Sequence, residues 1–368
     1  MLAGMSRLVF AALFAFVVAV AGPASAQGDE SPAGRQPLEV YFIDVEGGGA
    51  MLVVSPSGVS MLVDSGYPDL GGRDLRRLLR VIKDVAKLEV LNLAVVTHWH
   101  RDHYGNHAAL AAEIPIAAFA DRGIPDALQE DAEFETRIGD YRRASQNESI
   151  TLKARMVSDL DGTIVPVSEH VSFEIVAASR QVIDRSVRHP DQTMPNPYAE
   201  QHVPRDRDAS DNAESLAMVI RCGEFDLFCG GDLTWNVEAD LMTPNNPVGE
   251  VDVYMVTHHG LPTSNNPVLV KALDPTTAVM CNGPAKGGHP DVLALLRELT
   301  GNGDLKAWFQ LHENLSVPLE QQTELSRIAN RGPTESCEGR YVKVTYVPGS
   351  DEFTVAIEGR EPETFAVK

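Results

Sequence analysis

The sequence predicts an α/β protein built as a four-layer αββα sandwich. Short β-rich runs alternate with helical segments, this order occurs in two similar halves, and polar clusters follow directly on apolar runs. The 368 residues are 43% hydrophobic, which is enough to bury a large core. We therefore expect two sheets that face each other, with helices on their outer sides.

Residues 1–26 have the pattern of a cleaved signal peptide. A single positive charge precedes an apolar run from Leu8 to Ala21, and small residues follow at Ala24-Ser25-Ala26. The alternative is a membrane anchor, but the run is shorter than the roughly 20 residues that a span needs. Residues 27–37 are polar and predict a flexible leader. We expect an exported bacterial protein, periplasmic or secreted, with no membrane contact after cleavage.

The charge restricts the class of partner. The formal net charge is −21, from 31 basic and 52 acidic residues, and this field repels polyanions. Long nucleic acid is therefore not an expected partner. Export permits disulfides, but the four cysteines have no C-x-x-C spacing, so the sequence assigns no pairing.

The first half begins with short β-rich runs that predict a meander, at residues 38–44, 50–55 and 59–64. Residues 74–87 form an amphipathic helix pattern, with apolar side chains at Leu75, Leu78, Leu79, Ile82 and Val85. A further strand is expected at residues 90–97. It leads directly into a cluster of histidines, which indicates a site at the carboxyl edge of a sheet.

Residues 120–210 are less regular, and we expect an insertion or lid there. The regular pattern returns with strands at residues 215–222, 225–232, 251–257 and 277–283, and with helices at residues 267–273 and 290–299. Three late strands are expected at residues 305–311, 340–347 and 352–358. We assign residues 38–300 to one domain and expect the strands of residues 301–368 to pack on it.

The segment THWHRDH contains four candidate metal ligands, His98, His100, Asp102 and His103. Imidazole and carboxylate groups are ligands of Zn²⁺ and related ions. Alternate residues of an extended loop point to the same side, so His98 and His100 can hold one ion. Asp102 and His103 then turn toward a second ion.

The pattern H-x-H-x-D-H resembles the signature of the metallo-β-lactamase-fold hydrolases. This resemblance implies two divalent metal ions, zinc first and manganese as the alternative. It makes Asp64 in LVDSG an aspartate that orients the ligand loop, and Asp232 in FCGGDL a carboxylate that bridges the ions. His259 in VTHHG matches the final ligand. His258 would then be a substrate contact or proton donor, although the two histidines could exchange roles.

Within this family the chain resembles the hydrolase domain of ComEC-like DNA-uptake proteins. The matching segments are YFIDVEGGGAMLV, NAESLAMVI, VDVYMVTHHG and GGHP, over about residues 38–300. Two positions depart from the family pattern. Residues 46–49 read Glu-Gly-Gly-Gly instead of Gly-Gln-Gly-Asp, and Asp211 stands where many members have a third histidine.

The third ligand of the first metal is therefore open. Asp211 could supply an oxygen and favour harder ions such as Mn²⁺, or it could be an ordinary loop residue. His170 and His189 are rival candidates.

The resemblance implies a metal-dependent hydrolase that cleaves a phosphodiester or phosphoester with a metal-bound hydroxide. Asp102, His258 and His289 are the expected catalytic residues, with His258 or His289 in contact with a phosphoryl oxygen. The acidity favours a small phosphate-containing ester as the substrate. The alternatives are hydrolysis of a C–N or C–O bond, as in β-lactams or lactones, and a non-catalytic binding module with a degraded metal centre.

Overall fold

The computed structural model describes residues 36–68, 70–154, 164–168, 170–183 and 194–368. The expected signal peptide, most of the leader and His189 lie outside the described residues. Within these ranges, no helix has the length and apolar character needed to cross a bilayer.

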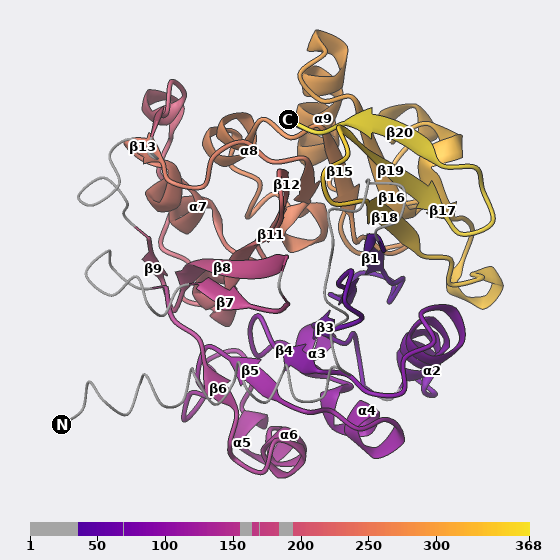
Figure 1. Ribbon diagram of the computed structural model, residues 1–368. Coiled ribbons are helices and arrows are strands. Elements are labelled where there is room, and N and C mark those ends of the chain that lie inside the picture. Colours follow the sequence, from indigo (N-terminus) through magenta and orange to yellow (C-terminus); the bar gives the residue numbers. More distant parts are fainter. Residues whose placement is uncertain (1–35, 69, 155–163, 169, 184–193) are drawn as a thin grey trace.

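The described chain forms two large mixed sheets (Figure 1). The strands of the first sheet are β1 (Leu38–Phe42), β2 (Met51–Val54), β3 (Ser60–Val63), β4 (Leu93–Val95), β5 (Phe119–Asp121), β6 (Ile150–Thr151), β18 (Val342–Tyr346), β19 (Glu352–Ile357) and β20 (Glu363–Ala366). Their order is β20-β19-β18-β1-β2-β3-β4-β5-β6. The expected meander is confirmed, because β1, β2 and β3 pair antiparallel in sequence order.

The strands of the second sheet are β7 (Ile164–Pro166), β8 (Val171–Ala178), β9 (Gln181–Val182), β11 (Ala217–Cys222), β12 (Phe225–Cys229), β14 (Val253–Met255), β15 (Thr277–Met280), β16 (Ala307–His312) and β17 (Ile328–Asn330). Their order is β17-β16-β15-β14-β12-β11-β8-β7, with β9 paired to β8. A separate two-stranded ribbon joins β10 (Met194–Pro195) to β13 (Asn245–Asn246).

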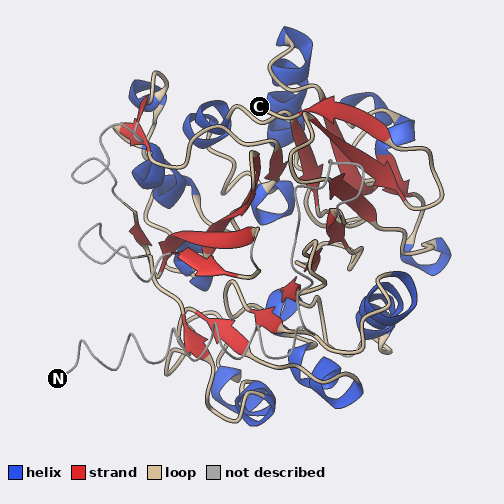
Figure 2. Cartoon of the chain, viewed as in Figure 1, coloured by secondary structure: helices blue, strands red, loops and turns tan. Residues whose placement is uncertain are grey.

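Helices cover the outer faces of both sheets (Figure 2). On the first sheet they are α2 (Arg73–Leu79) with its π-helical continuation (Arg80–Val85), α3 (Arg101–Tyr104), α4 (His107–Glu113), α5 (Phe134–Arg137) and α6 (Gly139–Ala144). On the second sheet they are α7 (Trp235–Met242), α8 (Pro267–Leu273) and α9 (Pro290–Asn302). The predicted four-layer sandwich is confirmed.

Alternation along the strands separates two core layers. Met51 and Val53 of β2 point into the core between the sheets, together with Phe173 and Leu227 of the second sheet. Leu52, between them in sequence, points the other way and packs against the helices that cover the first sheet. This period of two is why the apolar runs of β1 to β3 are buried on both faces.

Residues 120–210, where we expected an insertion or lid, contribute strands to both sheets. This range contributes β6 to the edge of the first sheet and β7 and β8 to the second sheet. In the tail, β16 and β17 extend the second sheet and β18 to β20 extend the first.

Parallel strands bring the predicted ligands to one edge. β3 and β4 are parallel in the first sheet, and β12, β14 and β15 are parallel in the second. Leu216 N, just before β11, donates to Thr97 O, just after β4, at 2.8 Å and links the two sheets at this edge. Within the second sheet, His258 N after β14 donates to Gly231 O after β12 at 3.0 Å. The loops that follow these strands therefore share one site, as α/β folds commonly arrange.

Candidate metal centre

Two groups of potential ligands meet at this edge. The first consists of His98, His100 and Asp232, and the second of Asp102, His103, Asp232 and His259. Within each group the potential ligand atoms all lie within 4.8 Å of one another, and Asp232 belongs to both. The structure thus assembles, from the loops after β4, β12 and β14, six of the side chains that the sequence marked as ligands.

Hydrogen bonds fix the tautomers of the first and third histidines of the loop. Asp64 Oδ2 accepts from His103 Nδ1 at 2.7 Å, so Nε2 is the nitrogen of His103 whose lone pair a cation would take. Thr97 Oγ1 donates its one proton to Asp64 Oδ2 at 2.7 Å, so it accepts from His98 Nδ1 at 3.1 Å. His98 Nε2 therefore also presents a lone pair. Asp64 has the orienting place that the resemblance implied.

The other two histidines are held in the same manner. His100 Nε2 donates to Glu130 Oε1 at 2.9 Å, which leaves His100 Nδ1 as its ligand atom. His259 Nδ1 donates to the Cys281 carbonyl at 3.1 Å and leaves Nε2 facing Asp232 Oδ1 at 3.4 Å. A carboxylate or carbonyl behind each ligand nitrogen is the arrangement that metal sites use to set ring orientation and basicity.

The residues present fit divalent cations. His98 Nε2 and Asp232 Oδ1 are buried without a hydrogen-bond partner, which is costly for groups that find no ligand. Burial alone would raise the pKa of Asp102 and Asp232. The surrounding histidines outweigh burial and hold both pKa values well below the usual value, so both carboxylates are ionised. Burial lowers the pKa of His103, but Asp232, Asp64 and Asp102 raise it well above its usual value. This concentration of negative charge attracts positive charge, as divalent cations would supply.

His258 faces the same centre from the edge. Its Nε2 lies 3.4 Å from Asp232 Oδ2 and 3.3 Å from Asn212 Nδ2, while its Nδ1 contacts the hydroxyls of Ser264 and Thr263. Burial lowers its pKa to about 4, so the ring is neutral near pH 7. His258 and His259 both have positive φ, at 54° and 55°, a backbone conformation that costs free energy and is concentrated at functional sites.

Lys286, which the sequence analysis did not identify, also reaches the centre. It follows β15, and its Nζ pairs with Asp102 Oδ2 and lies 3.1 Å from the Tyr67 hydroxyl. Burial alone would lower the pKa of its ammonium. Asp102 and, to a smaller extent, Asp232 outweigh burial and raise this pKa above its usual value, so the group stays charged. The sequence gives only a weak indication of this role, because Lys286 is a single lysine in the Gly- and Pro-rich segment CNGPAKGGHP that follows an apolar strand. Glu130 has no signal, since it lies in a polar loop.

Asp211 is not brought into either ligand group. Its Oδ2 accepts from Trp99 N at 2.5 Å, and its Oδ1 pairs with the buried guanidinium of Arg122. Its own N–H donates to Glu130 Oε1 at 2.7 Å. Both oxygens thus have protein donors, so the expected ligand role is replaced by support for the loop that carries His100. The rival candidate His170 is exposed.

His289 is placed differently from the expected catalytic role. Its Nδ1 accepts from Asp291 N at 3.3 Å and caps α9, and its side chain is 41% exposed. Only its backbone contacts the histidine loop, where His289 N donates to Gly260 O at 2.8 Å. The GGHP segment therefore serves as a turn and helix start rather than as a source of an imidazole for the centre.

A third group of potential ligands, Asp44, Glu46 and Cys337, has its charge balanced by protein cations. Arg77 pairs with Asp44 at 3.2 Å and with Glu46 at 2.9 Å, and Arg73 pairs with Glu46 at 2.8 Å. We assign this group a structural role. All four cysteines are free, so no disulfide links them.

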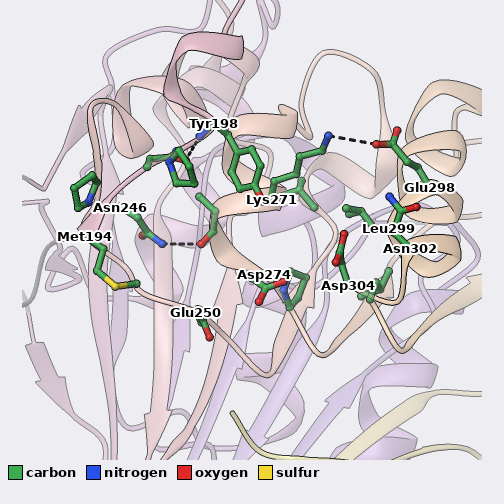
Figure 3. Close-up of a pocket in the computed structure, with 17 residues that line it drawn as sticks. Met194, Tyr198, Asn246, Glu250, Lys271, Asp274, Glu298, Leu299, Asn302 and Asp304 are labelled. Carbon is green, nitrogen blue, oxygen red and sulfur yellow. Dashed lines mark hydrogen bonds and ion pairs between the residues drawn. The ribbon is translucent and has the colours of Figure 1, made fainter.

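A cavity of about 480 Å³ lies away from the metal centre, beside α8 and α9 (Figure 3). Tyr198, Asn246 and Lys271 are among its lining side chains, and none of the predicted ligands is. Its position at the amino-terminal ends of β14 and β15 separates it from the edge of the sheet that carries the ligand groups.

Comparison with known proteins places this geometry in a family context. Residues 44–179 match the family described as "Metallo-beta-lactamase superfamily". A search of curated proteins found no match. The metallo-β-lactamase fold protein YhfI from Bacillus subtilis is 12% identical, covers 75% of this chain and 96% of its own length, and superposes with a TM-score of 0.44. The diiron β-hydroxylase CmlA from Streptomyces venezuelae is 14% identical, with 74% of this chain and 52% of CmlA covered, and a TM-score of 0.42.

Proposed function

We propose that this chain is a metal-dependent hydrolase of small phosphoesters, and the match of residues 44–179 to the metallo-β-lactamase superfamily supports this proposal. One observation carries this proposal. Asp232 belongs to both ligand groups, so a single carboxylate can bridge two cations held by His98 and His100 on one side and by Asp102, His103 and His259 on the other.

Two bound cations would lower the pKa of water and draw charge from the attacked centre. The protein supplies the geometry. Asp64, Glu130 and the Cys281 carbonyl hold the ligand histidines in the required tautomers. These contacts are made before any substrate enters, so the ligand atoms need no reorganisation.

We assign His258 the role of contacting the substrate. Its ring is neutral and its Nε2 faces Asp232 without belonging to either ligand group. A neutral imidazole in this place can donate to, or accept from, an oxygen of the reacting group. Asn212, whose Oδ1 is buried without a hydrogen-bond partner, lies beside it and can bind a further polar atom of the substrate.

The preference for a small phosphoester rests on charge and resemblance. A net charge of −21 disfavours long nucleic acid but leaves a compact ester free to reach a cationic centre. The HHG segment with its preceding strand resembles that of ComEC-like hydrolases, which supports phosphate chemistry. The signal-peptide pattern supports action outside the cytoplasm.

Hydrolysis assays with the metal-reconstituted protein test the reaction class. We expect turnover of bis-p-nitrophenyl phosphate or of p-nitrophenyl phosphate, and none of nitrocefin. The Asp102→Ala variant, which lacks a ligand of the second group, should lose this activity. Turnover of nitrocefin without phosphoester turnover would replace the proposal by C–N bond hydrolysis. Binding of less than one metal equivalent would indicate a non-catalytic module.

A further inference from the structure

Lys286 lies at the rim of the centre, outside both ligand groups. Its Nζ pairs with Asp102 Oδ2 and lies 3.1 Å from the Tyr67 hydroxyl. The side chain is 33% exposed, whereas Asp102 is 10% and His103 only 2% exposed. The ammonium therefore lies between the ligand cluster and solvent, where an incoming anion would meet it.

The chain makes room for this lysine. Gly47 has a φ of 96°, and a Cβ atom there would lie 2.8 Å from Cβ of Lys286 and 3.2 Å from its Cγ. A side chain at position 47 would collide with the stem of Lys286. The stem of Lys286 thus packs against the glycine-rich turn that follows β1, and its ammonium reaches the second ligand group.

We propose that Lys286 and Tyr67 form an anion subsite that holds a phosphoryl oxygen of the substrate beside the second ligand group. This inference rests on the proposed function, since it names the part of a phosphoester that the rim recognises. An ammonium has three donors, and the contacts with Asp102 and Tyr67 use two of them. The third donor and the Tyr67 hydroxyl are available to an oxyanion.

The subsite differs in chemistry from the neighbouring pair of Asn212 and His258. Both of these side chains are neutral and offer single hydrogen bonds. Lys286 is a point charge on a partly exposed stem, which suits an oxyanion that enters and leaves with each turnover. Substrates that carry negative charge next to the scissile bond should therefore be preferred over neutral esters.

Inorganic phosphate is a probe that does not depend on turnover. Its affinity for the metal-reconstituted protein is measured by calorimetry, together with the metal content, for Lys286→Met and Lys286→Arg. We expect Lys286→Met to bind phosphate roughly tenfold or more weakly at unchanged metal content, because a charge-assisted hydrogen bond is lost. Lys286→Arg should recover most of the affinity. Lys83→Met, which removes an exposed lysine, is the matched control for charge.

Two results would overturn the subsite. One is unchanged phosphate affinity in Lys286→Met. The other is a loss of metal in this variant, which would make Lys286 a residue that positions Asp102. A protein that binds phosphate through Lys286 but hydrolyses no phosphoester would support the subsite and refute the proposed function, so the two failures are distinguishable.

Discussion

Asp64 and His103 form the best-defined pair of the centre, with the carboxylate accepting from His103 Nδ1 at 2.7 Å. Asp64 also accepts from the backbone N–H of Thr97 at 2.9 Å and from its hydroxyl at 2.7 Å. Thr97 in turn accepts from His98. One carboxylate at the end of β3 therefore orients a ligand of each group on the loop after β4.

Replacing Asp64 should weaken metal binding in both groups. In Asp64→Ala we expect the affinity for Zn²⁺ to fall by about 10- to 100-fold, because both His103 and Thr97 lose their acceptor. Competition with a chromophoric chelator measures this change. Asp84→Ala, which alters an exposed carboxylate, is the control. An Asp64→Ala protein with unchanged affinity would show that the ligand rings are held by packing alone.

The shared position of Asp232 predicts a difference in stoichiometry. Asp232→Ala removes a ligand from both groups, so we expect weak binding of both cations. His259→Ala removes a ligand of the second group only and should leave one tightly bound equivalent. Elemental analysis after dialysis against a fixed free-metal concentration compares the two variants. Equal losses from both would contradict the bridging assignment.

Glu130 should affect the first group alone. It accepts from His100 Nε2 and from the N–H of Asp211, which joins the His100 ring to the 211–214 turn. In Glu130→Ala the metal affinity of the first site should fall roughly tenfold. This is the lower end of the roughly 10- to 100-fold loss expected when a hydrogen-bond partner of a metal ligand is removed, because Glu130 is partly exposed. Glu130→Gln should lose less, since an amide oxygen can still accept from His100. A loss confined to the second site would refute this role.

The sequence was most informative where local pattern and chemistry agree. The helix at residues 267–273 was predicted with its observed bounds, because Asn266 caps it and Pro267 begins it. The H-x-H-x-D-H loop could also be identified from the sequence alone, since four candidate ligands stand within six residues. The αββα order followed from the alternation of strands and helices.

Contacts between distant segments were not readable. Arg122 is far from Asp211 in sequence, and only the folded chain shows that its guanidinium pairs with Asp211 and so removes it as a ligand. Likewise, the approach of Lys286 to Asp102 depends on the register of two sheets. Within residues 120–210, the pairing of β6 with the first sheet and of β8 with the second was likewise not readable, because it joins segments that are distant in sequence.

His107 should make stability depend on pH. Burial lowers its pKa from 6.5 to about 4, so the folded state disfavours the proton that the unfolded chain binds. The stability contributed by the neutral ring is complete above pH 6.5 and is lost as pH falls toward 4, by about 3 kcal/mol for a shift of this size. Denaturant unfolding of wild type and His107→Phe at pH 7 and pH 4 measures the difference. An equal pH dependence in both proteins would exclude His107 as its source.

Gly49, which stands where the ComEC-like pattern has Asp, provides a last test. A Cβ atom at position 49 would lie 2.7 Å from His103 Nδ1 and 2.8 Å from Asp64 Oδ2, so it would separate the pair that orients the ligand loop. We expect Gly49→Ala to lower the free energy of unfolding by about 1–3 kcal/mol and to weaken metal binding, because the loop must shift. Gly301→Ala on α9, where an added Cβ meets nothing within 4 Å, should instead be neutral or stabilising by up to about 1 kcal/mol. If Gly49→Ala loses stability but keeps its metal affinity, the Asp64–His103 hydrogen bond tolerates displacement and the ligand geometry is set elsewhere.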